Sequence, residues 1–134
     1  MILLLFSFAD EGRLCVGAGT KMKTAVSVTF SGSAGLRCGE WLSFGAPDLP
    51  SDQRSVAPYH ACWRSPALTE PLHILGRAQV VADCRLETDQ AQLYAALCHV
   101  FARGGAVRLL TYGLLNISGQ WGNTSLSKWD TVTL

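Results

Sequence analysis

The segment RCGEWLSFG, residues 37–45, carries the side chains of this chain that most resemble a catalytic loop. Cys38 offers a nucleophile and Glu40 a base, whereas Trp41 and Phe44 can equally pin an irregular segment to a sheet. A cysteine nucleophile needs a histidine close in space, and the histidines of this chain are well separated from Cys38 in sequence. Both the catalytic and the packing interpretation of this segment therefore stay open at this point.

Other catalytic motifs are weak. A nucleophile elbow needs Gly-x-Ser-x-Gly, and the nearest case, Ser33 in SGSAG, has Ser31 at the first glycine position. The stretch GAGTK at residues 17–21 lacks the GKT or GKS order of a phosphate loop. Cys98 and His99 are best explained as strand residues, because a free cysteine mostly behaves as a small buried hydrophobe. The sequence predicts no catalytic residue.

The cysteines and histidines do not form a metal-ligand pattern. All five cysteines lie more than ten residues apart, and the histidines have no acidic residue at ligand spacing. An odd, scattered set of cysteines indicates reduced, buried thiols. We expect neither a metal nor a cofactor. The residues concerned are Cys15, Cys38, Cys62, Cys84, Cys98, His60, His73 and His99.

Composition limits the partners. A chain of 134 residues is one ordinary domain, and its 49% apolar and 16% charged residues predict a surface that a partner covers. The net charge of +1 disfavours nucleic acid, which needs clustered positive charge. The apolar N-terminal ILLLFSF lacks a preceding basic region and is too short to span a membrane. We expect a soluble, cytoplasmic chain without a membrane partner.

The elements that must position these residues are predicted to be short strands. Residues 2–8 are an apolar run that ends in an Asp-Glu-Gly turn, and Thr24–Phe30 alternate with a period of two. Residues 78–87 alternate most clearly, with Ala82 and Cys84 on the inward face. Residues 45–58 contain three prolines and predict a long surface loop.

The C-terminal half predicts a hairpin. Residues 93–101 and 106–117 flank an Arg-Gly-Gly turn and are rich in strand formers, and shorter strand candidates lie at 59–64 and 72–75. Six to eight short strands without a convincing helix indicate an all-β, antiparallel sandwich. The polar segment after Ile117 predicts a domain at 1–117 and a loosely ordered tail at 118–134.

The order of several short segments resembles a known family. They are FADEGRL from Phe8, DQR from Asp52, SPALTEPL from Ser65, ILG from Ile74, AALC from Ala95 and YGLLN from Tyr112. Together they resemble the C-terminal, non-catalytic domain of Xaa-Pro dipeptidyl-peptidases and cocaine-esterase-like serine hydrolases, over roughly four fifths of the chain. The resemblance implies a jelly-roll, galactose-binding-like β-sandwich that packs on an α/β-hydrolase domain.

This resemblance also assigns roles. The family's serine, aspartate and histidine belong to the hydrolase domain, so none is carried over and the chain is predicted to be inactive alone. Trp41, Phe44 and Trp63 are then predicted to lie at the domain interface, and Cys38 becomes a bystander. The chain departs from the family at HVFARGG, residues 99–105, and after Ile117, which predicts a truncated, incomplete sandwich.

Two alternatives stand beside this prediction. One is a free-standing carbohydrate-binding module, in which tryptophans form a sugar-stacking platform. The other is a non-functional fragment that has lost its closing strands. The tryptophans available for a platform are Trp41, Trp63, Trp121 and Trp129.

Overall fold

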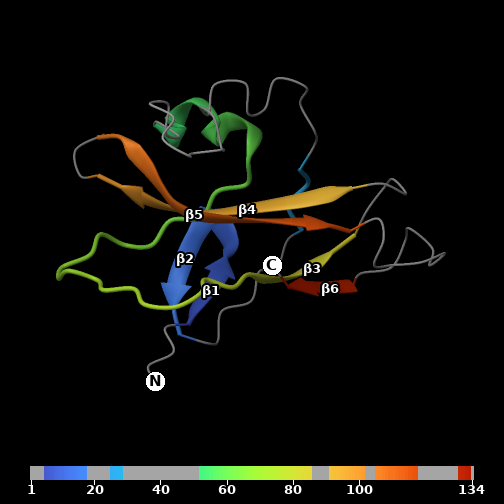
Figure 1. Cartoon of the computed structure of the whole chain (residues 1–134), viewed down its shortest axis with the longest axis horizontal. Coiled ribbons are helices and arrows are strands. Elements are labelled where there is room, and N and C mark those ends of the chain that lie inside the picture. The colour runs from blue at the N-terminus through green and yellow to red at the C-terminus, as the bar shows by residue number, and fades with distance from the viewer. Residues whose placement is uncertain are drawn as a thin grey trace. The chain divides into compact units, whose positions relative to one another are not determined.

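The computed structural model describes residues 5–17, 25–28, 52–85, 91–101, 105–117 and 130–133. Within them the chain forms strands and 3-10 turns and no α-helix, which confirms the all-β class (Figure 1). The strands pair into three two-stranded sheets, β1 with β2, β3 with β6, and β4 with β5. These pairings do not distinguish a jelly roll from other antiparallel arrangements. The elements are β1 Phe6–Ala9, η1 Asp10–Gly12, β2 Arg13–Val16, η2 Gln53–Ser55, η3 Ala57–Tyr59, β3 Val81–Cys84, β4 Gln92–Val100, β5 Val107–Asn116 and β6 Asp130–Thr133.

The chain divides into two compact units. The first comprises Met1–Ile74 and Val100–Arg108, and the second comprises Leu75–His99 and Leu109–Leu134. The hairpin β1–β2 and the 3-10 turns belong to the first unit, and the pair β3–β6 belongs to the second.

The first unit is organised around the β1–β2 hairpin. Its antiparallel register runs from Phe6 opposite Val16 to Ala9 opposite Arg13, as the sequence predicts for an apolar strand that ends in a turn. The turn η1 places Gly12 at a φ of 68°, in the left-handed region that glycine tolerates because it has no Cβ.

A third segment pairs with this hairpin. The Arg64 N–H donates to the Gly12 carbonyl at 2.8 Å, and the Leu14 N–H donates to the Arg64 carbonyl at 2.7 Å. The predicted strand at residues 59–64 is therefore wrong for most of its length, since only Arg64 makes a bridge. The preceding residues form η3, whose Pro58 has no N–H to give to a ladder.

The turns η2 and η3 give order to part of the predicted surface loop. Asp52 caps η2, because its Oδ1 accepts the N–H of Arg54 at 3.1 Å and the N–H of Val107 at 2.9 Å. Gln53 and Val56 are only 6% and 5% exposed. In the described part of the loop, residues 52–58, these two side chains are thus buried while Arg54, Ser55 and Pro58 stay exposed, and residues 45–51 lie outside the described ranges.

The β3–β6 pair contains the clearest predicted strand. Within β3, Ala82 and Cys84 are half-buried and Val81 and Asp83 are exposed, which confirms the predicted alternation for residues 81–84. Residues 78–80 of the predicted strand have no strand assignment, and Ala78 is exposed. Its partner β6 lies at the end of the segment after Ile117, in the last few positions, where strand alternation returns. The segment Asp-Thr-Val-Thr is rich in β-branched residues, which favour a strand once a partner edge is present. The domain boundary at residue 117 stays a prediction.

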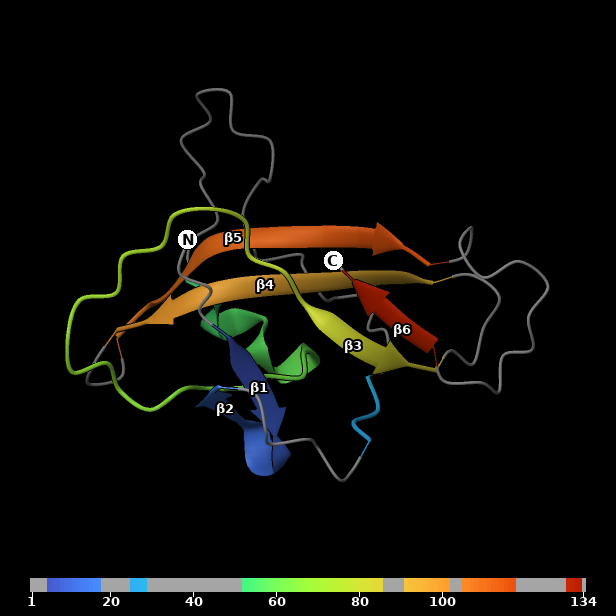
Figure 2. The same ribbon diagram turned by 90° about the horizontal axis from the view of Figure 1, so that it is seen from below.

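The β4–β5 hairpin confirms the predicted pair around the glycine turn (Figure 2). One flanking hydrogen bond runs from the Phe101 N–H to the Ala106 carbonyl, and the other from the Ile117 N–H to the Ala91 carbonyl. Between these bonds β5 has ten residues and β4 has nine.

Two predicted strands are not found. The described part of Thr24–Phe30, residues 25–28, has no strand assignment, and its Val26 and Val28 are 50% and 61% exposed. Residues 72–75 are also exposed and unassigned. An alternating pattern suits a strand, but a strand forms only where another edge accepts its backbone hydrogen bonds.

Candidate functional site

Trp63 is the described member of the predicted interface set. Trp41 and Phe44 lie outside the described residues, as do Cys38 and Glu40 of the same segment. Trp63 is therefore the one predicted interface residue whose surroundings the structure describes, and the candidate site consists of the residues around it.

Trp63 rests against β1. Its ring centroid lies 4.9 Å from that of Phe8, with an interplanar angle of 57°. This distance and tilt fall in the range that aromatic pairs prefer. Because Trp63 immediately precedes Arg64, the backbone bonds of Arg64 to the hairpin hold the indole in place.

Gly12 allows the close approach on which this arrangement depends. A Cβ at this position would lie 2.9 Å from the Cys62 carbonyl oxygen. Any other residue would push the Cys62–Arg64 segment away from the turn. The turn glycine thus sets the distance between the acidic residues of η1 and Trp63.

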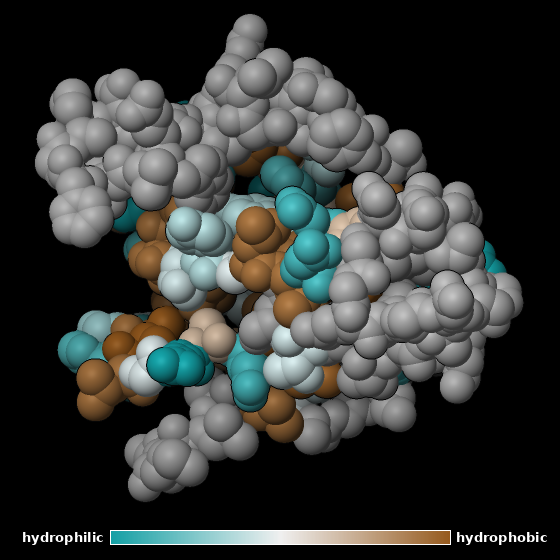
Figure 3. All heavy atoms as spheres, turned by 45° about the vertical axis from the view of Figure 1, so that its right-hand side comes forward, coloured by the Kyte–Doolittle hydropathy of each residue, from teal (hydrophilic) through white to brown (hydrophobic). Residues whose placement is uncertain are grey.

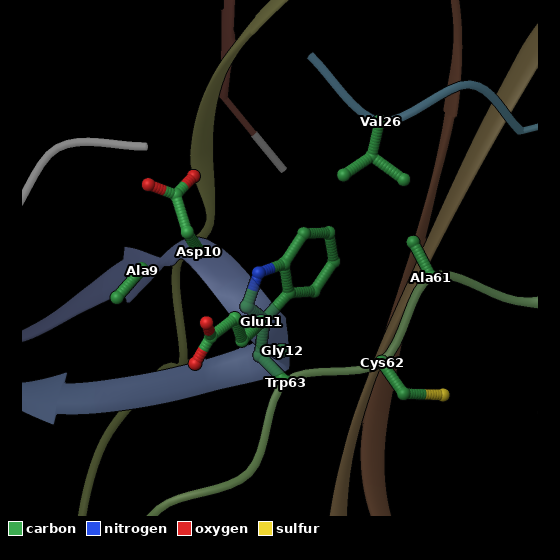
Figure 4. A pocket seen from close by; sticks show the side chains of 8 residues that line it. All are labelled: Ala9, Asp10, Glu11, Gly12, Val26, Ala61, Cys62 and Trp63. Carbon is green, nitrogen blue, oxygen red and sulfur yellow. The ribbon is translucent and has the colours of Figure 1, made fainter. Parts of the chain in front are cut away.

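A cavity of about 480 Å³ opens beside the indole. This volume falls in the range of small-molecule sites. Figure 4 shows the indole between the two acidic residues of η1 on one side and Val26 and Ala61 on the other. The described residues that line it are Ala9, Asp10, Glu11, Gly12, Val26, Ala61, Cys62 and Trp63.

The charges at this cavity are acidic and largely solvated. Glu11 Oε2 lies 4.0 Å from Arg13 Nε, and these side chains are 83% and 67% exposed. A pair this exposed contributes little, because water screens the charges and both side chains lose rotamer freedom. Little free energy is therefore needed to separate the Glu11 carboxylate from Arg13.

The nearby thiol does not have the surroundings of a nucleophile. The Cys62 thiol donates weakly to the carbonyl oxygens of Ala57 and His60, with Sγ 3.8 Å and 3.6 Å from them. His60 directs its Nδ1 to the Val56 carbonyl oxygen at 3.0 Å. Both side chains thereby hold the η3 turn together.

Cys84 is likewise not prepared to act as a nucleophile. Burial, and then the neighbouring Asp83 carboxylate, raise the pKa of Cys84, which keeps its thiol protonated at neutral pH. The prediction of free thiols is confirmed for the four described cysteines, but none is fully buried and Cys62 is exposed. Short two-stranded sheets leave one face of each strand open to water, so burial is incomplete.

Neither a metal cluster nor a membrane helix is found in the described parts. They hold no group of three His, Cys, Asp or Glu side chains arranged to share a metal ion. No described helix has the length and apolar character needed to cross a membrane.

Apolar side chains remain exposed in both units. Figure 3 shows apolar residues at the surface on the face in view. In the first unit Val16 is 71% exposed, and in the second Leu114 is 62% exposed and Leu75 fully exposed. Among the described apolar residues only Ala9, Val56 and Ile117 are buried.

Comparisons with known proteins do not identify the chain. A scan of protein-family models, a search of curated proteins and a search of solved structures each found no significant match. The family resemblance therefore remains a prediction from the sequence.

Sequence reasoning missed the acidic side of the cavity. It took Asp10, Glu11 and Gly12 only as a turn. The available sequence signal was an acidic turn directly after an apolar strand that carries Phe8. Trp63, which packs beside this turn, lies some fifty residues later, and no local sequence pattern predicts that the two segments meet.

Proposed function

We propose that this chain is a non-catalytic β-domain of a serine hydrolase of the Xaa-Pro dipeptidyl-peptidase and acyl-ester hydrolase type. Its role is to pack on an α/β-hydrolase domain whose residues lie outside this chain. The finer jelly-roll, galactose-binding-like fold belongs to the same proposal. The sequence resemblance supplies the family, and the exposed apolar surface supplies the physical need for a partner.

The observation that carries the proposal is the small number of buried apolar side chains beside many exposed ones. Among the described apolar residues only Ala9, Val56 and Ile117 are buried, whereas large apolar side chains of both units are exposed. Isolated exposed leucines are ordinary, but this balance is typical of a surface meant to be covered. Obligate interfaces are more apolar than other interfaces, so an apolar surface of this kind suits a permanent partner.

The chemistry of the described residues supports a non-catalytic role. Cys62 faces backbone carbonyls and the raised pKa of Cys84 keeps it protonated, so neither is prepared for nucleophilic attack. We expect the isolated chain to show no hydrolysis of Xaa-Pro anilides or acyl esters. A fluorophosphonate probe, which labels reactive serines, should leave it unmodified, and labelling together with turnover would contradict the proposal.

Docking is the direct test. The α/β-hydrolase domain of a family enzyme, with its own β-domain deleted, is mixed with this chain and followed by size-exclusion chromatography and thermal unfolding. We expect a one-to-one complex and a higher melting temperature of the hydrolase domain. Failure to associate, while circular dichroism shows that the chain is folded, would refute the proposal.

Matched tryptophan variants locate the interface. Trp41→Phe and Trp63→Phe replace residues of the predicted interface, and Trp63→Phe keeps an aromatic ring beside Phe8. Trp121→Phe makes the same chemical change outside that set. Binding should weaken for the first two variants and stay unchanged for the third.

A further inference from the structure

The segment of residues 65–79 is exposed along its whole length. All of its residues lie at the surface, and none belongs to a strand or a helix (Figure 1). The chain passes from the first compact unit to the second within this segment, between Ile74 and Leu75. Pro66 and Pro71 have no N–H, which disfavours pairing of the segment with a sheet edge.

Hydrogen bonds do not tie this segment to the described part of the fold. Its one hydrogen bond among the described residues is local, from the Ser65 hydroxyl to the Pro66 carbonyl oxygen at 3.0 Å. An endopeptidase binds its substrate as an added strand, through main-chain hydrogen bonds and pockets for the side chains. The segment can enter such a cleft without the opening of any described strand.

The apolar side chains of the segment indicate which bond is cut. Leu72 and Ile74 are 42% and 56% exposed, whereas Leu75 is fully exposed. A peptidase pocket must enclose the whole side chain before the scissile bond, so complete exposure favours Leu75. We propose that the Leu75–Gly76 bond is a processing site for an endopeptidase with a large apolar primary pocket, and that the cleaved chain stays together as a complex of two fragments.

Gly76 suits the other side of this bond. Its φ is 124°, and no atom lies within 4 Å of the position that a Cβ would occupy. Glycine changes its backbone angles at little cost, so the bond can adopt the extended form that a peptidase cleft requires. In the reaction, water adds to the Leu75 carbonyl carbon and the C–N bond to Gly76 breaks. Leu75 then ends in a carboxylate and Gly76 begins with an ammonium group.

The fragments are expected to remain associated because the first unit contains residues from both sides of the cut. Val100–Arg108 follows the cut in sequence, yet it belongs to the same unit as Met1–Ile74. Within that unit the Val107 N–H donates to Asp52 Oδ1 at 2.9 Å. Hydrolysis at Leu75 therefore removes a covalent link and leaves this contact in place.

Limited digestion of the full chain with chymotrypsin tests the site. Mass spectrometry follows the new N-terminus at Gly76. It should form about tenfold or more faster than any new end within β4 or β5, because those strands are paired and must open before they are cut. Faster cleavage of any other bond between residues 52 and 117 would overturn the proposal.

Variants assign the cleavage to the Leu75 side chain. Leu75→Ser should slow the formation of the Gly76 end by about tenfold or more, because the apolar pocket is left unfilled, and Leu75→Phe should restore it. Leu114→Ser makes the same change at a residue that is 62% exposed within β5, and it should leave the rate at Gly76 unchanged. Equal rates for Leu75→Ser and the parent chain would refute the site.

Size-exclusion chromatography of the cleaved chain tests the complex. We expect one peak that contains both fragments, and Asp52→Ala should lower the urea concentration at which they separate. Separate elution of the parent fragments without urea would refute the two-fragment form. The proposal does not depend on hydrolase docking, because the peptidase is added to the chain alone.

Discussion

The β1–β2 hairpin and the β4–β5 hairpin show two ways in which strands of this chain are held. The first has four-residue strands, yet its turn contacts Cys62, its strands accept the Arg64 segment, and Phe8 packs on Trp63. The second has strands of nine and ten residues, but Leu110, Tyr112 and Leu114 remain exposed on β5.

The difference teaches that strand length and packing are separate properties. A long hairpin satisfies many backbone groups, whereas its side chains gain free energy only where another element removes them from water. A two-stranded hairpin is at best marginally stable in water. The short hairpin should therefore respond strongly to substitution, and the long one should respond weakly until a partner covers it.

The largest effect is expected at the turn of the short hairpin. Gly12→Ala adds a Cβ 2.9 Å from the Cys62 carbonyl oxygen at a φ of 68°. The left-handed strain and the clash together should lower the free energy of unfolding by about 2 to 4 kcal/mol. Urea unfolding followed by tryptophan fluorescence measures this.

Gly17→Ala is the control for that substitution. Gly17 has a φ of 98° but no atom within 4 Å of a Cβ, so it isolates the strain from the clash. It should cost about 1 to 2 kcal/mol. If both variants lose the same stability, the close approach of Cys62 to the turn is not important.

Aromatic contacts should differ between the two regions. A double-mutant cycle with Phe8→Ala and Trp63→Ala should give a coupling of about 0.5 to 1.5 kcal/mol. The corresponding cycle with Tyr94→Ala and Tyr112→Ala tests a wider pair, with centroids 6.0 Å apart, and should fall at or below the lower end of that range. A larger coupling in the tyrosine pair would reverse the comparison.

The cap at Asp52 should appear in the pH dependence of stability. The Arg54 side chain, and next the Val107 N–H, lower the pKa of Asp52 from 3.8 to about 2. A lowered pKa stabilises the folded state above the unfolded pKa, and this contribution is lost as the pH falls from 4 to 2. The urea concentration at the unfolding midpoint of the parent chain should therefore decrease as the pH is lowered from 4 to 2.

Two variants at this cap check the origin of the effect. Asp52→Asn should be less stable than the parent at neutral pH and should show a flatter profile between pH 4 and 2. Arg54→Gln removes the largest cause of the lowered pKa, so its loss of stability between pH 4 and 2 should be smaller than in the parent and should be complete at a higher pH. An Arg54→Gln profile that matches the parent would assign the effect to the Val107 bond instead.

The smallest effect is expected on β5. Leu110→Thr and Leu114→Thr replace side chains that are 51% and 62% exposed with a good strand former, so the free energy of unfolding should change by about 0.5 kcal/mol or less. Val56→Thr makes a similar change at a site that is 5% exposed and should cost about 1 to 3 kcal/mol. A large loss at β5 in the isolated chain would mean that this face is already covered.

Local pattern predicted the elements whose contacts are close in sequence. The strand-and-turn at β1 and η1, the alternation in β3 and the hairpin around the glycines were all predicted, because strand period and turn chemistry depend on neighbouring residues. Local pattern predicted strands wrongly at residues 25–28 and 59–64. Alternating or apolar residues are present there, but the described residues form no strand, and only Arg64 makes a β-bridge.

The candidate site was predictable only in part. Trp63 was selected by type, since large aromatics concentrate at interfaces and binding sites. Its neighbours Asp10, Glu11 and Gly12 were not predicted to belong to the site. About fifty residues separate this turn from Trp63, and no periodicity in the sequence connects the two segments. The sequence does not distinguish a turn carboxylate that is merely exposed to water from one that binds a ligand.

The sequence by itself determined the all-β class, the strand period, the turn at Asp10–Gly12 and the high share of apolar residues. The tertiary structure alone decided that Arg64 pairs with β2, that β6 pairs with β3, and that Trp63 stands beside the acidic turn. The physical reason is that strand pairing and side-chain packing join residues far apart in the chain. Their free energy depends on which surfaces meet, and a local pattern shows only that a surface is ready to be covered.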